Sequence, residues 1–230
     1  MIKIRPAAAR GVTRTPWLDS RHTFSFAEYY EPEHMGFHTL RVINQDIVKP
    51  DTGFATHSHK DMEIITYVLK GAVTHKDSLG NETVIQPGEI QRMSAGTGVK
   101  HSEYNKSKTE ILELLQIWIL PTQKNLPPSY QQKGFDRKQT GLQLLVSSNG
   151  AEDSLLIHQQ AKIFRGYLLA EQNIEIPVIA NTHFWLQLIS GQLLLKHQLL
   201  NPGDGIAIAD ENLIKIKANQ VSEFLLFELA

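Results

Sequence analysis

The chain has 230 residues, of which 41% are hydrophobic and 20% charged, and its net charge is −1 at pH 7. This composition is ordinary for a soluble globular protein, and charges spread so thinly disfavour a direct nucleic-acid partner. Because the chain has no cysteine, disulfides are excluded, and any metal ion must be held by nitrogen and oxygen ligands.

The N-terminal stretch MIKIRPAAARGVTRTPW lacks the apolar segment of a signal peptide. No stretch of the chain reaches the roughly 18 apolar residues that a membrane-spanning helix requires. From the sequence we therefore expect a cytoplasmic protein without a membrane partner.

Short β-strands separated by turns dominate the first half of the chain. The strand pattern, rich in β-branched residues, occurs at 40–44, 64–69, 73–75 and 83–85. Turn residues separate these runs, at Gly71, 77–81 and 87–88. Residues 112–120 (LELLQIWIL) are apolar enough for a buried strand, which Pro121 ends. Short strands with a turn roughly every 8–12 residues favour an all-β sandwich or barrel.

A polar stretch, PTQKNLPPSYQQKGFDRKQTG at 121–141, separates this half from a second one that resembles it. Both halves have an apolar strand, a glycine, another strand, a turn, Pro-Gly-acidic and a further strand, at 67–96 and 186–211. Internal duplication is the interpretation we favour, although β proteins also reuse such turns without it. We expect an N-terminal domain at 1–121, a linker at 122–141 and a C-terminal domain at 142–230.

The stretch THSHKDME (56–63) offers several possible metal ligands. Alternate residues of a strand point to one face, so an extended chain here would align His57, His59, Asp61 and Glu63. The two histidines alone are equally consistent with a solvated strand face. Glu63 is ambiguous, because it could be a ligand itself or an acceptor that orients a histidine.

A second pair, His101 and Glu103, follows the Pro87-Gly88 turn. His101 alone would more often be an ordinary core or surface histidine. Two neighbouring strands that each offer two ligands form a four-ligand cage of three imidazoles and one carboxylate, which suits a divalent first-row transition metal. A site without thiolates, with open coordination positions, favours catalysis over structural support.

Longer stretches extend the match beyond single residues: WLDSRHTFSFAEYYEP (17–32), MGFHTLRVIN (35–44), HSHKDMEIITYVLKG (57–71), HKDSLGN (75–81) and MSAGTGVKHSEYN (93–105). Together they resemble the pirin family of the cupin superfamily, in particular its bacterial, quercetin-cleaving members. The resemblance covers most of 1–120 and continues more loosely beyond. Ser94 stands where the general cupin motif has proline.

The resemblance implies a bicupin, an all-β protein of two antiparallel jelly-roll barrels. It implies one metal ion, in the N-terminal barrel, with His57, His59, His101 and Glu103 as ligands and with Glu63 left out. Iron(II) is the expected metal, and nickel, copper, manganese, cobalt and zinc are the alternatives, because nitrogen and oxygen ligands do not select among them.

The second half does not repeat the ligands. Aligning Gly191 with Gly71 places Pro177, Ile179 and His183 opposite His57, His59 and Glu63, and aligning the Pro-Gly turns places Ile216 and Ala218 near His101 and Glu103. We therefore expect the C-terminal barrel to lack a metal site. His158, His183 and His197 are expected to be structural or exposed to solvent.

The resemblance implies a dioxygenase that uses O2 to cleave the central ring of a flavonol such as quercetin, releasing CO and a depside. Glu103 is the candidate catalytic base, in addition to being a ligand. Apolar walls would hold the planar substrate; the candidates are Phe24, Phe26, Phe54 and Met93, each of which could equally be a core residue. The alternatives are a metal-binding regulatory protein that modulates a protein partner, and a different cupin reaction on a small phenol or enol.

Overall fold

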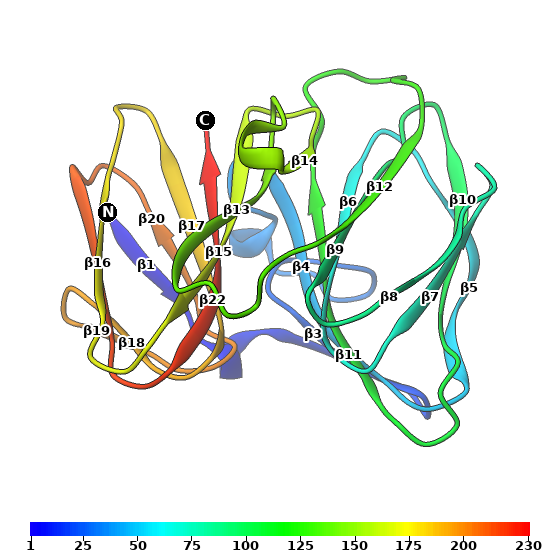
Figure 1. Cartoon of the computed structure of the whole chain (residues 1–230), viewed down its shortest axis with the longest axis horizontal. Helices are drawn as coiled ribbons and strands as arrows, with labels where there is room; N and C mark the ends of the chain where they lie inside the picture. Colours follow the sequence, from blue (N-terminus) through cyan, green and yellow to red (C-terminus); the bar gives the residue numbers. More distant parts are fainter. The chain divides into compact units, whose positions relative to one another are not determined.

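The computed structural model describes all 230 residues, and nearly all of its regular structure is β-strand (Figure 1). The chain forms two compact units. The N-terminal unit comprises Gly11–Phe135 and Ile157–Gln159, and the C-terminal unit comprises Met1–Arg10, Asp136–Leu156 and Gln160–Ala230. Each unit contains one seven-stranded and one four-stranded sheet.

The N-terminal unit is built from antiparallel strands. Its larger sheet has the order β12-β9-β6-β11-β4-β3-β2 and comprises β2 (Gly11–Arg14), β3 (Leu18–His22), β4 (Leu40–Val48), β6 (Glu63–Lys70), β9 (Glu89–Ser94), β11 (Leu112–Ile119) and β12 (Ser129–Gly134). Its smaller sheet has the order β5-β10-β7-β8 and comprises β5 (Thr52–His59), β7 (Val73–Asp77), β8 (Glu82–Ile85) and β10 (Val99–Asn105). A single 3₁₀ turn, η2 (Pro32–His34), lies between β3 and β4.

The C-terminal unit repeats this plan. Its larger sheet, β1-β20-β17-β22-β15-β13-β14, comprises β1 (Ile2–Arg5), β13 (Gly141–Ser147), β14 (Leu155–Leu156), β15 (Ala161–Leu168), β17 (His183–Ser190), β20 (Gly205–Ile208) and β22 (Ser222–Leu229). Its smaller sheet, β16-β21-β18-β19, comprises β16 (Asn173–Pro177), β18 (Leu193–Leu195), β19 (Gln198–Leu200) and β21 (Leu213–Ala218). The remaining elements are the 3₁₀ turns η1 (Ala7–Ala9) and η3 (Ala151–Asp153).

The matching strand orders agree with an internal duplication. The order β16-β21-β18-β19 corresponds to β5-β10-β7-β8. In each smaller sheet the last two strands, β18 and β19 or β7 and β8, form a hairpin. Gly71 and Gly191, which follow β6 and β17, both have a positive φ, of 72° and 83°. A side chain is disfavoured in this region of φ, which explains why both halves keep glycine at that turn.

Part of the polar stretch at 121–141 forms a strand. Residues Ser129–Gly134 form β12, which pairs with β9 and covers the edge of the larger sheet in the N-terminal unit. Arg92 of β9 reinforces the pairing by donating hydrogen bonds to Ser129 and Gln131. The strand-forming residues are polar because β12 is itself an edge strand. The domain limits expected from the sequence stay a prediction. Met1–Arg10 belongs to the C-terminal unit.

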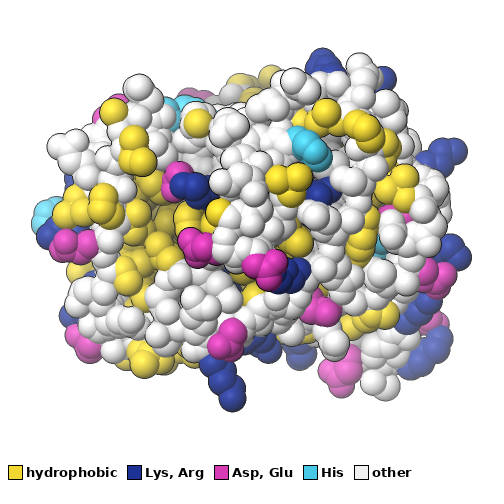
Figure 2. All heavy atoms as spheres, turned by 45° about the horizontal axis from the view of Figure 1, so that its top comes forward, with side chains coloured by type: hydrophobic (Ala, Val, Ile, Leu, Met, Phe, Trp, Pro, Cys, Tyr) yellow, Lys and Arg dark blue, Asp and Glu magenta, His cyan; other side chains and the backbone are white.

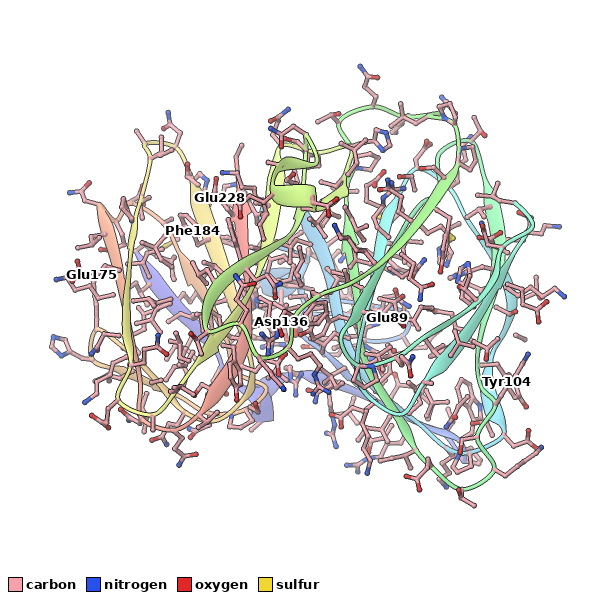
Figure 3. All side chains as sticks on the ribbon, viewed as in Figure 1. Glu89, Tyr104, Asp136, Glu175, Phe184 and Glu228 are labelled. Carbon is pink, nitrogen blue, oxygen red and sulfur yellow. The ribbon has the colours of Figure 1, made fainter.

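The two interiors differ in chemistry. The C-terminal unit encloses a large apolar cluster with Leu186, Leu193, Ile214, Ile216 and Phe224 at its centre, and Phe184 points into this unit whereas Glu175 of β16 lies on its outer side (Figure 3). The N-terminal unit has smaller apolar clusters, and buried polar side chains lie beside them.

No helix in the structure is long and apolar enough to cross a membrane. Basic and acidic side chains are interspersed over the face of the molecule shown in Figure 2, as the net charge of −1 would suggest.

Candidate metal centre

Strand β10 brings two of the sequence-predicted ligands to the inside of the N-terminal unit. Its residues alternate in burial, so His101 and Glu103 are buried whereas Tyr104 lies on the outer side (Figure 3). β10 lies between β5 and β7, and His101 is directly opposite His57 of β5. A shift of register between His101 and Glu103 on the β5 side marks a β-bulge, a feature that often re-aims side chains beside functional sites.

Three imidazoles converge at this point. The Nε2 atoms of His57 and His101 are 3.0 Å apart, and the ring centres of His57, His59 and His101 lie within 4.5–4.8 Å of one another. Nδ1 of His57 is 2.8 Å from the carbonyl oxygen of Ala55. Donation of its proton to that carbonyl leaves the Nε2 lone pair directed at the cluster.

The surroundings of His59 and His101 favour neutral imidazoles. Burial, together with the nearby His57 and His75, lowers the pKa of His101 to about 3. Burial also lowers the pKa of His59 to about 4, with contributions from His101 and His57. Neutral imidazole is the form that binds metal ions. The Nε2 atoms of His57 and His101 are close enough for both to bind one metal ion.

Glu103 is held in place by two hydrogen bonds. Thr66 donates from Oγ1 to Oε1 over 3.1 Å, and Gln116 donates from Nε2 to Oε2 over 2.7 Å. The carboxyl group is buried, and the two bonds fix its orientation. Neither Thr66 nor Gln116 was singled out from the sequence.

The possible ligand atoms form two triplets that share His101. One is His57, His59 and His101, and the other is His75, His101 and Glu103; within each triplet all atoms lie within 4.8 Å. His75, a fully buried residue of β7, was not predicted as part of the site. Its Nε2 is 2.9 Å from Oδ2 of Asp77, which makes His75 a neighbour of the cluster already committed to a carboxylate.

Asp61 and Glu63 do not share the face of His57 and His59. Strand β5 ends at His59, and the chain turns at Asp61, which has a φ of 50°. Glu63 then begins β6 and is buried away from the histidine cluster, where it accepts a hydrogen bond from Ser94 and lies 3.2 Å from Nδ1 of His158. The chain is therefore not extended throughout 57–63, which was the condition for the four side chains to share a face. The histidine beside Glu63 is not one of the three in the cluster.

A cavity of about 220 Å³ opens beside the cluster. Apolar residues form much of its wall: Leu18, Phe26, Phe54 and Trp118. Trp118 packs edge-on against both His59 and Phe26, with ring centres 4.9 and 5.4 Å apart. Two of the wall residues proposed from the sequence, Phe26 and Phe54, do line the cavity, whereas Phe24 and Met93 are buried core residues outside it.

The three histidines expected to be structural or exposed are not part of the cluster. His158 contacts Glu63, His183 begins β17, and His197 is exposed in the turn between β18 and β19. In the C-terminal unit the positions that correspond to β5 and β10 carry the apolar side chains of Ile174, Ile176, Ile214 and Ile216. No group of three or more possible metal ligands occurs there. Fold and site together define a two-domain cupin with a single candidate metal centre, in its N-terminal unit.

Comparison with known proteins narrows this class. Residues 4–119 match the family model described as Pirin, and residues 144–229 match the one described as quercetinase C-terminal cupin domain. The chain belongs to the pirin family.

Relatives match along their whole length. The quercetin 2,3-dioxygenase of Escherichia coli (strain K12) is 48% identical over 229 residues, which cover 100% of this chain and 99% of that protein. A putative quercetin 2,3-dioxygenase of Pasteurella multocida is 45% identical and covers 100% of both. The crystal structure of the bacterial pirin YhhW of Escherichia coli in complex with nickel(II) matches with a TM-score of 0.97 and 47% identity, covering 100% of this chain and 99% of that one.

Proposed function

We propose that this protein is a metal-dependent dioxygenase that cleaves the central ring of a flavonol such as quercetin. The observation that carries the proposal is the convergence of His57, His59 and His101 on one point beside an apolar cavity. Relatives that match over the full chain are named quercetin 2,3-dioxygenases, which supports the same reaction here.

His57, His59, His101 and Glu103 are the proposed ligands of one divalent ion. Iron(II) is the metal we expect, and the nickel(II) complex of the related YhhW supports nickel as an alternative. When bound, the ion supplies Lewis acidity, which lowers the pKa of a coordinated O–H group. His75 is not among the four proposed ligands; its Nε2 is hydrogen-bonded to Asp77.

The protein's own residues bind, orient and deprotonate the substrate. Phe26, Phe54 and Trp118 line a slot suited to planar aromatic rings and exclude water from it. Glu103 takes the proton of the flavonol 3-hydroxyl, for which its buried carboxylate still has acceptor capacity beyond the bonds from Thr66 and Gln116. The reaction balances as flavonol plus O2 giving a depside plus CO.

The test measures O2 uptake and CO release with quercetin, using protein of known metal content. Wild type is expected to consume O2 and release CO in equal amounts, and His59→Ala to lose both, because one imidazole ligand is removed. His197→Ala is the matched control, since that histidine is exposed in the C-terminal unit. Metal-loaded wild type that neither consumes O2 nor releases CO would refute the dioxygenase and leave the regulatory alternative.

A further inference from the structure

A row of polar side chains crosses the larger sheet of the N-terminal unit, facing the cavity. His22, Asn44, Gln116 and Thr66 stand opposite one another on β3, β4, β11 and β6. Nδ1 of His22 is 2.8 Å from Oδ1 of Asn44, and Gln116 donates to Glu103. Nε2 of His22 is 2.8 Å from the hydroxyl of Thr13. The members of this row hydrogen-bond to one another or to Glu103.

Asp46 follows Asn44 by two residues on β4 and lines the same cavity, but its hydrogen bonding differs from that of the row. It stands between Ser20 and Leu114 in the sheet and lines the cavity that holds the histidine cluster. Its side chain is buried, with 4% of the residue exposed. The Ser20 hydroxyl hydrogen-bonds its carboxyl group, but Oδ1 has no partner.

A buried carboxyl oxygen without a partner is costly, and native proteins have few of them. The sheet neighbours do not relieve the cost, because Leu114 is apolar and Asn44 is engaged with His22. Oδ1 is itself covered by protein atoms, but Asp46 is one of the residues that line the cavity, so a ligand there would lie against this side chain. A polar group at a cavity wall fixes a ligand's orientation.

We propose that Asp46, supported by Ser20, is a specificity-determining residue that hydrogen-bonds a ring hydroxyl of the bound phenol. The inference rests on the proposed function for the nature of the ligand, but not for the existence of the subsite. The hydroxyl that Asp46 binds is distinct from the hydroxyl presented to the histidine cluster. A planar substrate held between Phe54 and Trp118 would be anchored at two points.

The carboxyl group suits this task in either protonation state. Burial raises the pKa of Asp46 to about 7, with the Ser20 hydrogen bond opposing the rise and the charge of Glu103 adding to it. A protonated carboxyl donates to a phenol oxygen and an ionised one accepts from a phenol O–H. Neither contact is available from a flavonol that lacks ring hydroxyls.

The test compares the binding of quercetin and of 3-hydroxyflavone, which lacks the ring hydroxyls, to metal-loaded protein without O2. Calorimetric titration gives the ratio of the two affinities. Asp46→Leu, which replaces the carboxyl by an apolar group of similar size, is expected to weaken quercetin about tenfold and to leave 3-hydroxyflavone unchanged. Asp46→Ala provides the same comparison if the leucine variant does not fold.

Asp19→Asn is the matched control, because Asp19 lies on the neighbouring strand and is paired with Arg14 and Arg21 at the surface. It should keep the wild-type ratio. A ratio that stays at the wild-type value in the Asp46 variants would overturn the inference even if quercetin is turned over. Wild type that binds quercetin selectively without consuming O2 would refute the proposed reaction and still support the subsite.

Discussion

At the scale of single residues, the centre depends on side chains that hold the proposed ligands as much as on the ligands themselves. Glu103 keeps its orientation through Thr66 and Gln116, and His57 through the carbonyl of Ala55. A ligand fixed in this way loses little freedom when an ion binds, which strengthens binding.

Removing one supporting bond should therefore weaken metal binding. Gln116→Leu leaves Oε2 of Glu103 without its donor, and we expect the affinity for nickel(II) to fall about 10- to 100-fold. Calorimetric titration measures it. Gln45→Leu is the control, because Gln45 is on the neighbouring strand and bonds Glu113 instead. Equal affinities in the two variants would contradict a role for Gln116 in holding Glu103.

Asp46 should make the metal-free protein less stable as the pH rises. Because burial raises the pKa of Asp46 from 3.8 to about 7, the folded protein binds more protons than the unfolded chain between these values. The contribution of Asp46 to the free energy of unfolding is therefore fully present below pH 4 and is lost as the pH rises through 7.

Asp46→Asn removes this penalty. We expect the variant to gain stability over wild type between pH 5 and pH 8, by up to a few kcal/mol at about 1.4 kcal/mol per pKa unit. Urea unfolding at both pH values gives the comparison. Parallel pH profiles for the two proteins would show that Asp46 is not buried in its neutral form.

At the scale of the elements, the strands and the ligand pairs could be predicted from the sequence because alternate residues of a strand face the same side. The apolar run that predicted the strand at 112–120 also contained a missed signal, since Gln116 and Trp118 share a face within it. Their role depends on Glu103 and His59, which are distant in the sequence. The turn at Asp61 was missed because the alternating His-x-His-x-Asp-x-Glu spacing outweighed the preference of aspartate for left-handed turn positions over strands.

The pairing of β5 with β10 depends on Gly53. A Cβ atom there would lie 2.3 Å from the carbonyl oxygen of Glu103 and would strike Tyr104 as well. Gly53→Ala should push the strands apart and lower both metal affinity and thermal stability, the latter by about 1–3 kcal/mol. Gly134→Ala is the control, because a Cβ there meets only one atom, at 3.7 Å. Metal binding equal to wild type in Gly53→Ala would refute this account of the strand pair.

At the scale of the whole molecule, one topology carries two different interiors. The N-terminal unit has the polar cluster and a cavity, and the C-terminal unit has a continuous apolar core. The sequence allowed this difference to be predicted because aligned positions carry Pro177, Ile179, Ile216 and Ala218 instead of ligands. The exact replacements could not be predicted, since β16 ends at Pro177 and the residues that it packs against the core, partly buried, are Ile174 and Ile176.

We therefore expect one metal ion per chain. Elemental analysis should give a stoichiometry of one, unchanged when both His183 and His197 are replaced by alanine. His57→Ala with His101→Ala should bring it close to zero. A stoichiometry of two in wild type, or a loss in the His183/His197 variant, would place a second site in the C-terminal unit.

Strand β5 is at the edge of its sheet and pairs only with β10. Two proposed ligands thus sit on a strand secured on one side, which a local opening would release together. A bound ion would keep β5 paired with β10. The amide protons of β5 should therefore exchange with deuterium slowly in the metal-loaded protein and quickly after chelation. Escape of the ion would then be limited by the fraying of this strand, and the lifetime of the loaded state would be a property of the backbone.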